Sequence, residues 1–167
     1  MDLAKFHNLD IILLCGLYGS GKTAFARKHF RNRDRRRISR SEIRKLIYEM
    51  TNFGEQWKSE NFNESDDAVV KHLERKLVEH YLFQRIKVLV VNTFVTKKSR
   101  KRFIDFTREE GKTTGVIFLN TPLKKCFELN EKNGAPVPQT VINSLYSKIE
   151  LPDKSEGFQE VLIVDNS

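Results

Sequence analysis

The stretch Gly16-Leu17-Tyr18-Gly19-Ser20-Gly21-Lys22-Thr23 directly follows an apolar run, Ile-Ile-Leu-Leu-Cys, at residues 11–15. Its three glycines let the backbone turn tightly and present N–H groups to phosphate oxygens, which a Cβ atom would obstruct. Lys22 is placed to bring its charge to the β- and γ-phosphates, and the Thr23 hydroxyl to bind a magnesium ion between them. A helix expected over residues 22–30 adds the positive end of its dipole beneath the phosphates.

This pattern predicts a site for ATP, or another nucleoside triphosphate, together with Mg²⁺. A glycine-rich turn that merely caps a helix is the simpler alternative, but an apolar strand precedes this loop and a helical pattern follows it. The residues expected to hold the nucleotide are Gly16, Gly19, Ser20, Gly21, Lys22 and Thr23.

Length and composition are those of a small globular enzyme. The chain has 167 residues, of which 39% are hydrophobic and 31% charged, and this suits a single domain over residues 1–167. No apolar run is long enough to span a membrane, and residues 1–10 lack a signal-peptide pattern, so we expect a cytoplasmic protein without a membrane partner. Cys15 and Cys126 are expected to fill the core rather than to form a disulfide or a metal site.

Apolar strand patterns alternate with helical ones along the chain. This predicts a three-layer α/β P-loop NTPase fold, in which a parallel sheet has helices on both faces and the ligand at the carboxyl ends of its strands. Ser65 is the expected cap of a long helix at 66–84, whose buried stripe should be Val70, Leu73, Leu77 and Tyr81. The expected strands are 11–15, 37–39, 86–91, 115–119 and 160–164, and the expected helices are 22–30, 41–50, 66–84, 97–110, 122–131 and 139–148.

The positive charge is unevenly spread. There are 30 Lys and Arg against 22 Asp and Glu, a net charge of +8. Many of the basic residues fall in two clusters. Clusters of this kind can neutralise phosphates along a DNA or RNA strand; the plainer alternative is that they form solvated faces of the protein. The first cluster is Arg31, Arg33, Arg35, Arg36, Arg37 and Arg40, and the second is Lys97, Lys98, Arg100, Lys101 and Arg102.

A series of motifs in a fixed order resembles the kinase domain of polynucleotide 5′-kinases and their AAA-type, zeta-toxin-like relatives. In chain order the motifs are Gly-Ser-Gly-Lys-Thr at 19–23, Ile-Ser-Arg-Ser-Glu-Ile-Arg at 38–44, Val-Asn-Thr at 91–93 with Lys-Ser-Arg at 98–100, Pro-Val-Pro at 136–138, and Leu-Pro at 151–152 with Glu-Gly-Phe at 156–158. The resemblance implies transfer of the ATP γ-phosphate to a hydroxyl, commonly the 5′-hydroxyl of DNA or RNA. It also implies a lid at about 130–138.

The resemblance assigns roles on the acceptor side. Arg44 matches a family arginine that lies near the acceptor phosphate, and with Arg40 it would place the first basic cluster beside the acceptor channel. The family's usual carboxylate falls at Ser41, which cannot act as a general base unaided. Glu42 is the adjacent candidate base, although neighbouring side chains on a helix point about 100° apart. Ser41 is alternatively the N-cap of its helix.

Two more positions depart from the family pattern. Asn92 stands where relatives carry an aspartate near the magnesium ion; it can accept a hydrogen bond from metal-bound water, or it can simply be a strand-end turn residue. Asn133 stands where the transition-state arginine is expected, and the adjacent Lys132 is either its substitute or a solvated lysine at a helix end. A catalytically weak nucleotide-binding or ATPase module and a small-molecule kinase therefore remain alternatives to a polynucleotide kinase.

Overall fold

The computed structural model describes residues 2–31, 35–63, 66–134 and 136–166. Ser65, the expected cap, and Arg33 of the first basic cluster lie outside them. Within the described chain, one parallel sheet has the strand order β2-β3-β1-β4-β5. The strands are β1 Ile11–Cys15, β2 Arg35–Ser39, β3 Lys87–Val91, β4 Thr114–Asn120 and β5 Glu160–Asp165.

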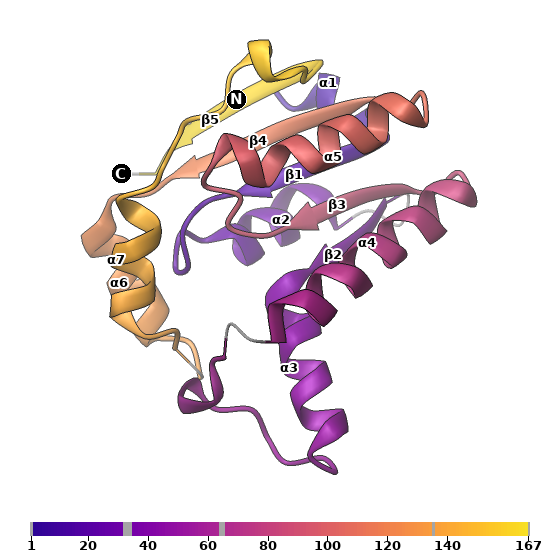
Figure 1. The fold of residues 1–167 in the computed structure, drawn as a ribbon. Coiled ribbons are helices and arrows are strands. Elements are labelled where there is room, and N and C mark those ends of the chain that lie inside the picture. The colour runs from indigo at the N-terminus through magenta and orange to yellow at the C-terminus, as the bar shows by residue number, and fades with distance from the viewer. Residues whose placement is uncertain (1, 32–34, 64–65, 135, 167) are drawn as a thin grey trace.

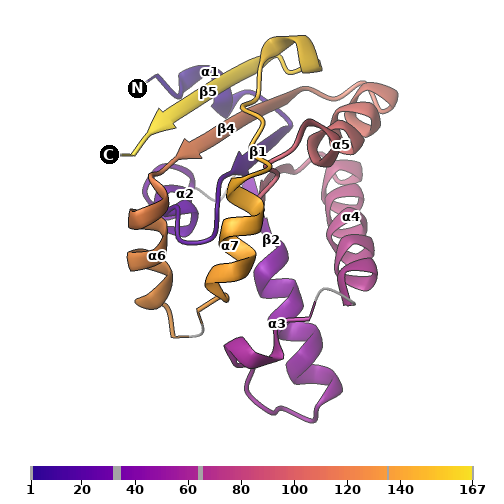
Figure 2. The ribbon, with the colours of Figure 1, turned by 60° about the vertical axis from the view of Figure 1, so that its left-hand side comes forward.

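Helices cover both faces of this sheet, which confirms the three-layer α/β fold (Figure 1). They are α1 Ala4–His7, α2 Lys22–Phe30, α3 Arg40–Thr51, α4 Asp67–Phe83, α5 Lys97–Glu109, α6 Leu123–Glu131 and α7 Gln139–Tyr146, with 3₁₀ turns at Ser59–Asn61 and Lys154–Glu156. In both views α6 and α7 stand side by side beyond the carboxyl ends of the strands, where the loop after β1 also lies (Figure 2).

The sheet separates two apolar layers because successive side chains of a strand point to opposite faces. On one face, Ile11, Leu13 and Cys15 pack with residues of α4 and α5. On the other, Ile12 and Leu14 pack with residues of α1 and α2. All five side chains of β1 are fully buried, as expected for a central parallel strand.

The expected cap at Ser41 is wrong, and two helices begin one residue away from the expected position. Helix α3 begins at Arg40, one residue earlier than expected, so its N-cap is the extended residue Ser39 and not Ser41. Helix α6 begins at Leu123 with Pro122 as its N-cap. Just before it, the Thr121 hydroxyl donates to the Ser20 carbonyl, 3.0 Å away, and this threonine is buried against the nucleotide loop.

The buried stripe of α4 also differs from the expected one. Val70, Glu74 and Val78 are fully buried, whereas Leu73 and Leu77 are more than one third exposed. Glu74 takes an inner position because its carboxylate accepts hydrogen bonds from Arg40, at 2.5 Å and 3.1 Å, and from Arg102, at 2.7 Å. A buried carboxylate with two arginine partners is satisfied in the core, and this rotates the apolar face of the helix.

Among the described residues, no helix is both long and apolar enough to cross a membrane.

Candidate functional site

The loop after β1 is shaped by glycines. Gly16, Gly19 and Gly21 all have positive φ angles, of 143°, 75° and 90°. A Cβ atom on Gly19 would lie 2.0 Å from the carbonyl oxygen of Cys126, in α6. The loop therefore needs glycine at this position both for its backbone conformation and for its close approach to α6.

Lys22 points back over its own loop. Its Nζ atom donates to the carbonyls of Gly16, at 2.8 Å, and Leu17, at 2.5 Å, and contacts the Ser20 hydroxyl at 3.3 Å. Burial lowers the pKa of Lys22 to about 8, since desolvation disfavours the charged amine. A cation held only by neutral oxygens is suited to gain an anionic partner, so the loop fits a bound phosphate chain.

Lys22 and Thr23 line a hollow of about 400 Å³ at the carboxyl ends of the strands. Ser39, Ser41 and Asn92 line it as well, so hydroxyl and amide oxygens face the position of the phosphates. These are oxygen ligands of the kind that Mg²⁺ accepts, but no carboxylate stands among the residues described around this hollow. The donors fit a magnesium ion that is held mainly by phosphates and water.

Asn92 serves as a turn residue at the end of β3. Its Oδ1 accepts a hydrogen bond from the Thr93 backbone N–H at 2.7 Å, and its own N–H donates to the Leu14 carbonyl. The Thr93 carbonyl in turn accepts from the Gly16 N–H at 3.0 Å. Asn92 thus ties the end of β3 to the start of the nucleotide loop, as the turn alternative requires.

A second hollow of about 250 Å³ adjoins the first. Tyr18, Gly19, Thr23 and Ser41 line its nucleotide side, and the two hollows share them. Its other walls come from the start of α3, from the aromatic side chains of the segment before α4, and from the end of α6 with the chain that follows. Those walls include Glu42, Arg44, Lys45, Trp57, Phe62, Asn130, Asn133, Gly134 and Val137.

Arg44 is the buried cation of this second hollow. Only 7% of the residue is exposed, and its Nη2 donates to Asp67 at 2.6 Å. The guanidinium lies 5.0 Å from the centre of the Phe62 ring, which also makes an edge contact with Tyr18. Arg44 Nε and Trp57 Nε1 are buried without a hydrogen-bond partner among the described residues, so two donors of this hollow are unsatisfied.

The other residues expected on the acceptor side are placed less centrally. Glu42 lines the second hollow, and its carboxylate binds Arg37 at 2.7 Å and 2.9 Å. Arg40 lines neither hollow; its guanidinium is held by Glu74 and lies 5.8 Å from the Phe94 ring.

Lys132 and Asn133 follow α6 and face the nucleotide loop. Both line the first hollow, and Asn133 lines the second as well. The buried Asn130 holds this segment in place, because its side chain bonds both the N–H and the carbonyl of Val137, at 3.0 Å and 2.8 Å. Neither Asn130 nor Tyr18 was expected as a site residue. The signal for Tyr18 in the sequence is its place within the loop.

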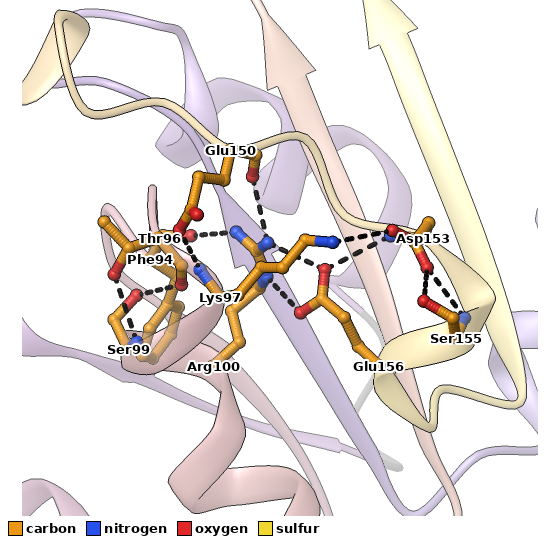
Figure 3. Close-up of polar contacts among 9 residues, drawn as sticks. All are labelled: Phe94, Thr96, Lys97, Ser99, Arg100, Glu150, Asp153, Ser155 and Glu156. Atoms are coloured by element: carbon orange, nitrogen blue, oxygen red, sulfur yellow. Dashed lines mark hydrogen bonds and ion pairs between the residues drawn. The ribbon is translucent and has the colours of Figure 1, made fainter.

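Arg100 and Glu156 join two of the quoted motifs into one buried ion pair (Figure 3). The Arg100 guanidinium binds both oxygens of Glu156 at 2.8 Å and donates to the carbonyls of Phe94 and Glu150. Phe94, two residues after Asn92, has a positive φ of 44°. The pair therefore fixes the chain between β3 and α5 next to the first hollow.

Comparison with known proteins shows the family to which the chain belongs. The model of a family described as "AAA domain" matches residues 11–152. The L-seryl-tRNA(Sec) kinase of Methanococcus maripaludis is 23% identical over 145 residues, which are 85% of this chain and 53% of that protein. The chain thus spans about half the length of this curated relative.

Solved structures share the fold. A putative kinase from Chloroflexus aurantiacus superposes with a TM-score of 0.71 at 15% identity, covering 94% of this chain and 85% of that one. A chain of the Pnkp1/Rnl/Hen1 RNA repair complex gives a TM-score of 0.65 at 18% identity, covering 89% and 46%. The resemblance to P-loop kinases is confirmed. With a family model matched from β1 to beyond α7, the chain belongs to the AAA domain family and is a nucleotide-binding domain of the P-loop kinase type.

Proposed function

We propose that this protein transfers the γ-phosphate of ATP to a hydroxyl group of a nucleic-acid acceptor, such as a polynucleotide 5′-hydroxyl. The observation that carries the proposal is the second hollow, which opens from the nucleotide loop and contains a buried arginine beside aromatic rings. A guanidinium suits a phosphate, and aromatic faces suit a base, so the hollow fits the end of a nucleic-acid strand.

The residues divide the work as follows. Gly16, Gly19 and Gly21 shape the cradle for the phosphates, while Lys22 leaves its loop carbonyls to neutralise charge that develops on the transferred group. Thr23 supplies a hydroxyl ligand for Mg²⁺, and Asn92 lines the same hollow. When bound, Mg²⁺ would supply further charge neutralisation at the β- and γ-phosphates.

On the acceptor side, Arg44 orients the acceptor and Glu42 takes the proton of the attacking hydroxyl. Glu42 is the only carboxylate among the described residues lining the second hollow, which supports this assignment. Lys132 approaches from the proposed lid, over residues 130–138, to add positive charge above the γ-phosphate. Arg40 acts indirectly, by anchoring the start of α3 to Glu74.

A second candidate function is a nucleotide-binding module with slow ATP hydrolysis. It is favoured by the neutral side chains of Ser41, Asn92 and Asn133 at the positions where the resembling kinases carry reactive groups. In this class of reaction, an arginine acting on the phosphoryl group contributes about three or more powers of ten to kcat.

The acceptor class can be tested by offering several hydroxyl acceptors with γ-labelled ATP and Mg²⁺. We expect label on a 5′-hydroxyl RNA or DNA oligonucleotide, none on the same oligonucleotide with a 5′-phosphate, and none with Lys22→Ala. Label on sugars or other small alcohols, with oligonucleotides untouched, would contradict the nucleic-acid acceptor and favour a small-molecule kinase. Arg44→Lys should raise the KM for the oligonucleotide more than it lowers kcat, because a lysine cannot make the bidentate contact.

A further inference from the structure

A third hollow, of about 500 Å³, shares Thr23 with the first and the second. We call it the arginine groove, because Arg27, Arg31, Arg35 and Arg37 all line it. It adjoins the first hollow, since Thr23 and Arg27 line both. No acidic side chain stands among its described lining residues.

Two different periodicities bring these arginines together. Arg27 and Arg31 are four residues apart at the end of α2, so they lie on one side of the helix axis. Arg35 and Arg37 are two residues apart on β2 and therefore point to the same face of the sheet, the face that α2 covers. Helix and edge strand thus present two arginines each to the space between them.

The four arginines are not equivalent. Arg35 is buried and donates to the carbonyls of Val88 and Leu9, at 2.8 Å and 2.9 Å, so it supports the wall of the groove. Arg37 is paired with Glu42, which the second hollow contains. Arg27 and Arg31 are exposed, and neither has an ion pair or side-chain hydrogen bond with any described residue.

The second basic cluster offers a contrast. Its members are largely neutralised within the protein: Lys97 pairs with Asp153, Arg100 with Glu156, Lys101 with Asp105 and Arg102 with Glu74. Among the described residues, the arginine groove therefore holds two unpaired positive charges, Arg27 and Arg31, whereas most of the charge in the second basic cluster is paired. Uncompensated like charges at helical spacing disfavour the free protein, which points to an anionic partner.

We propose that the arginine groove binds the phosphodiester backbone of a single-stranded nucleic acid. From Thr23 to Arg31 the groove follows about 12 Å of helix, at 1.5 Å per residue. This length suits a few consecutive phosphates. Between the arginines, the groove is lined by the apolar residues Ala26, Phe30 and Leu89, which suit the unpaired bases of a single strand and not the paired bases of a duplex. The proposal rests on the proposed function in that the bound strand is the acceptor, whose end would reach the second hollow past Thr23 and Ser41.

The test is the salt dependence of binding by the full chain. A fluorescent 5′-hydroxyl RNA 12-mer, and the DNA of the same sequence, are titrated at several salt concentrations. For single strands, the logarithm of the binding constant falls with the logarithm of salt by about 0.7 per neutralised phosphate. The variant Arg27→Ala/Arg31→Ala should therefore lower this slope by about 1.4 and weaken binding of unrelated sequences alike.

The control variant is Lys28→Ala/Lys98→Ala, which removes the same charge from exposed positions that do not line the groove. It should leave the slope nearly unchanged. Equal losses in the two variants would overturn the proposal, because bulk charge would then explain binding. Binding of a polyglutamate peptide with the same dependence on Arg27 and Arg31 would overturn it too, in favour of an acidic protein partner.

The experiments distinguish failure of the groove proposal from failure of the proposed kinase function. Arg31 lines the groove but neither of the other two hollows, so Arg31→Ala should bind ATP as the wild type does. If wild-type protein transfers phosphate to small acceptors but binds no oligonucleotide, the groove proposal fails and phosphotransfer stands. If oligonucleotides bind with the expected slopes but receive no phosphate, the groove stands and the proposed function fails. Comparison of RNA with DNA decides which strand is preferred.

Discussion

Lys22 is buried against the loop to which it belongs, and we expect this burial to make nucleotide binding sensitive to pH. The pKa of Lys22 is lowered to about 8 by burial, and a bound triphosphate would raise it again. Protonated Lys22 is the form that binds phosphate. ATP affinity should therefore be full below pH 8 and fall above it, by up to about tenfold per pH unit.

This prediction is checked by measuring the dissociation constant of ATP from pH 7 to 9.5 in the wild type and in Lys22→Arg. Arginine stays charged throughout this range, so the variant should show a flat profile whatever its overall affinity. An equal decline in both proteins would show that another group titrates.

Ser41 is exposed and lines both the first and the second hollow, so a carboxylate at this position would stand between nucleotide and acceptor. Ser41→Asp should raise the rate of phosphoryl transfer by about 10²-fold, since a positioned general base contributes 10² to 10⁴. Single-turnover rates with saturating ATP measure this. Ser41→Asn, with the same shape and no base, should not increase the rate; an equal gain in both variants would contradict the account.

At the scale of elements, the contact between the nucleotide loop and α6 makes Gly19 critical. A Cβ at Gly19 would meet the Cys126 carbonyl at 2.0 Å, and the residue also has a positive φ. We expect Gly19→Ala to cost about 3 kcal/mol or more of unfolding free energy, measured by urea denaturation. Gly54 has a similar φ of 86° and no neighbour within 4 Å, so Gly54→Ala isolates the backbone strain, at about 1–2 kcal/mol. Similar losses in the two variants would mean that the loop can move away from α6.

The Arg100–Glu156 pair holds the chain after β3 to the chain before β5. Glu156→Gln leaves a fully buried guanidinium without its counter-charge, and such a loss costs about 3–5 kcal/mol. The control, Asp105→Asn, removes a partner of Lys101 from an exposed pair on the same helix and should cost below about 1 kcal/mol. Denaturation midpoints of the two variants compare them; equal midpoints would show that Glu156 is not needed to neutralise Arg100.

Strands that are buried on both faces could be predicted from the sequence. β1, β3 and β4 are apolar runs covered on both faces, and the glycine loop has no other common meaning between a strand and a helix. The α4 stripe could not be predicted, because only its tertiary partners make Glu74 more buried than Leu73. The link between Arg100 and Glu156 was visible only as two separate motifs, since 56 residues separate them in sequence.

At the scale of the whole molecule, the sheet brings the components of the proposed kinase site to the carboxyl ends of its strands. The loop after β1, the start of α3 after β2, the turn after β3 and the lid after α6 meet there because parallel strands end together (Figure 1). That Gly19, Gly21, Lys22 and Thr23 line one hollow could be predicted from a local motif. The second hollow could not, since Tyr18, Arg44, Trp57 and Phe62 come from three separate segments and converge only in the fold.

The charge distribution can also be understood only at this scale. In the second basic cluster, Lys97, Arg100, Lys101 and Arg102 are all paired with acidic residues. In the first cluster, Arg37 and Arg40 are paired as well, but Arg31 lines a hollow without an ion pair to a described residue. The net charge of +8 gives the excess of basic over acidic residues but does not show where in the fold the unpaired basic residues lie.

The proposed reaction is transfer of the γ-phosphate from this site to a hydroxyl. A single-turnover experiment, with protein in excess over γ-labelled ATP, Mg²⁺ and a 5′-hydroxyl oligonucleotide, follows the label directly. We predict that label leaves ATP and appears on the oligonucleotide faster than as free phosphate, and that Lys22→Ala abolishes both. Label that stays on bound ATP, or that appears only as free phosphate, would contradict the proposal.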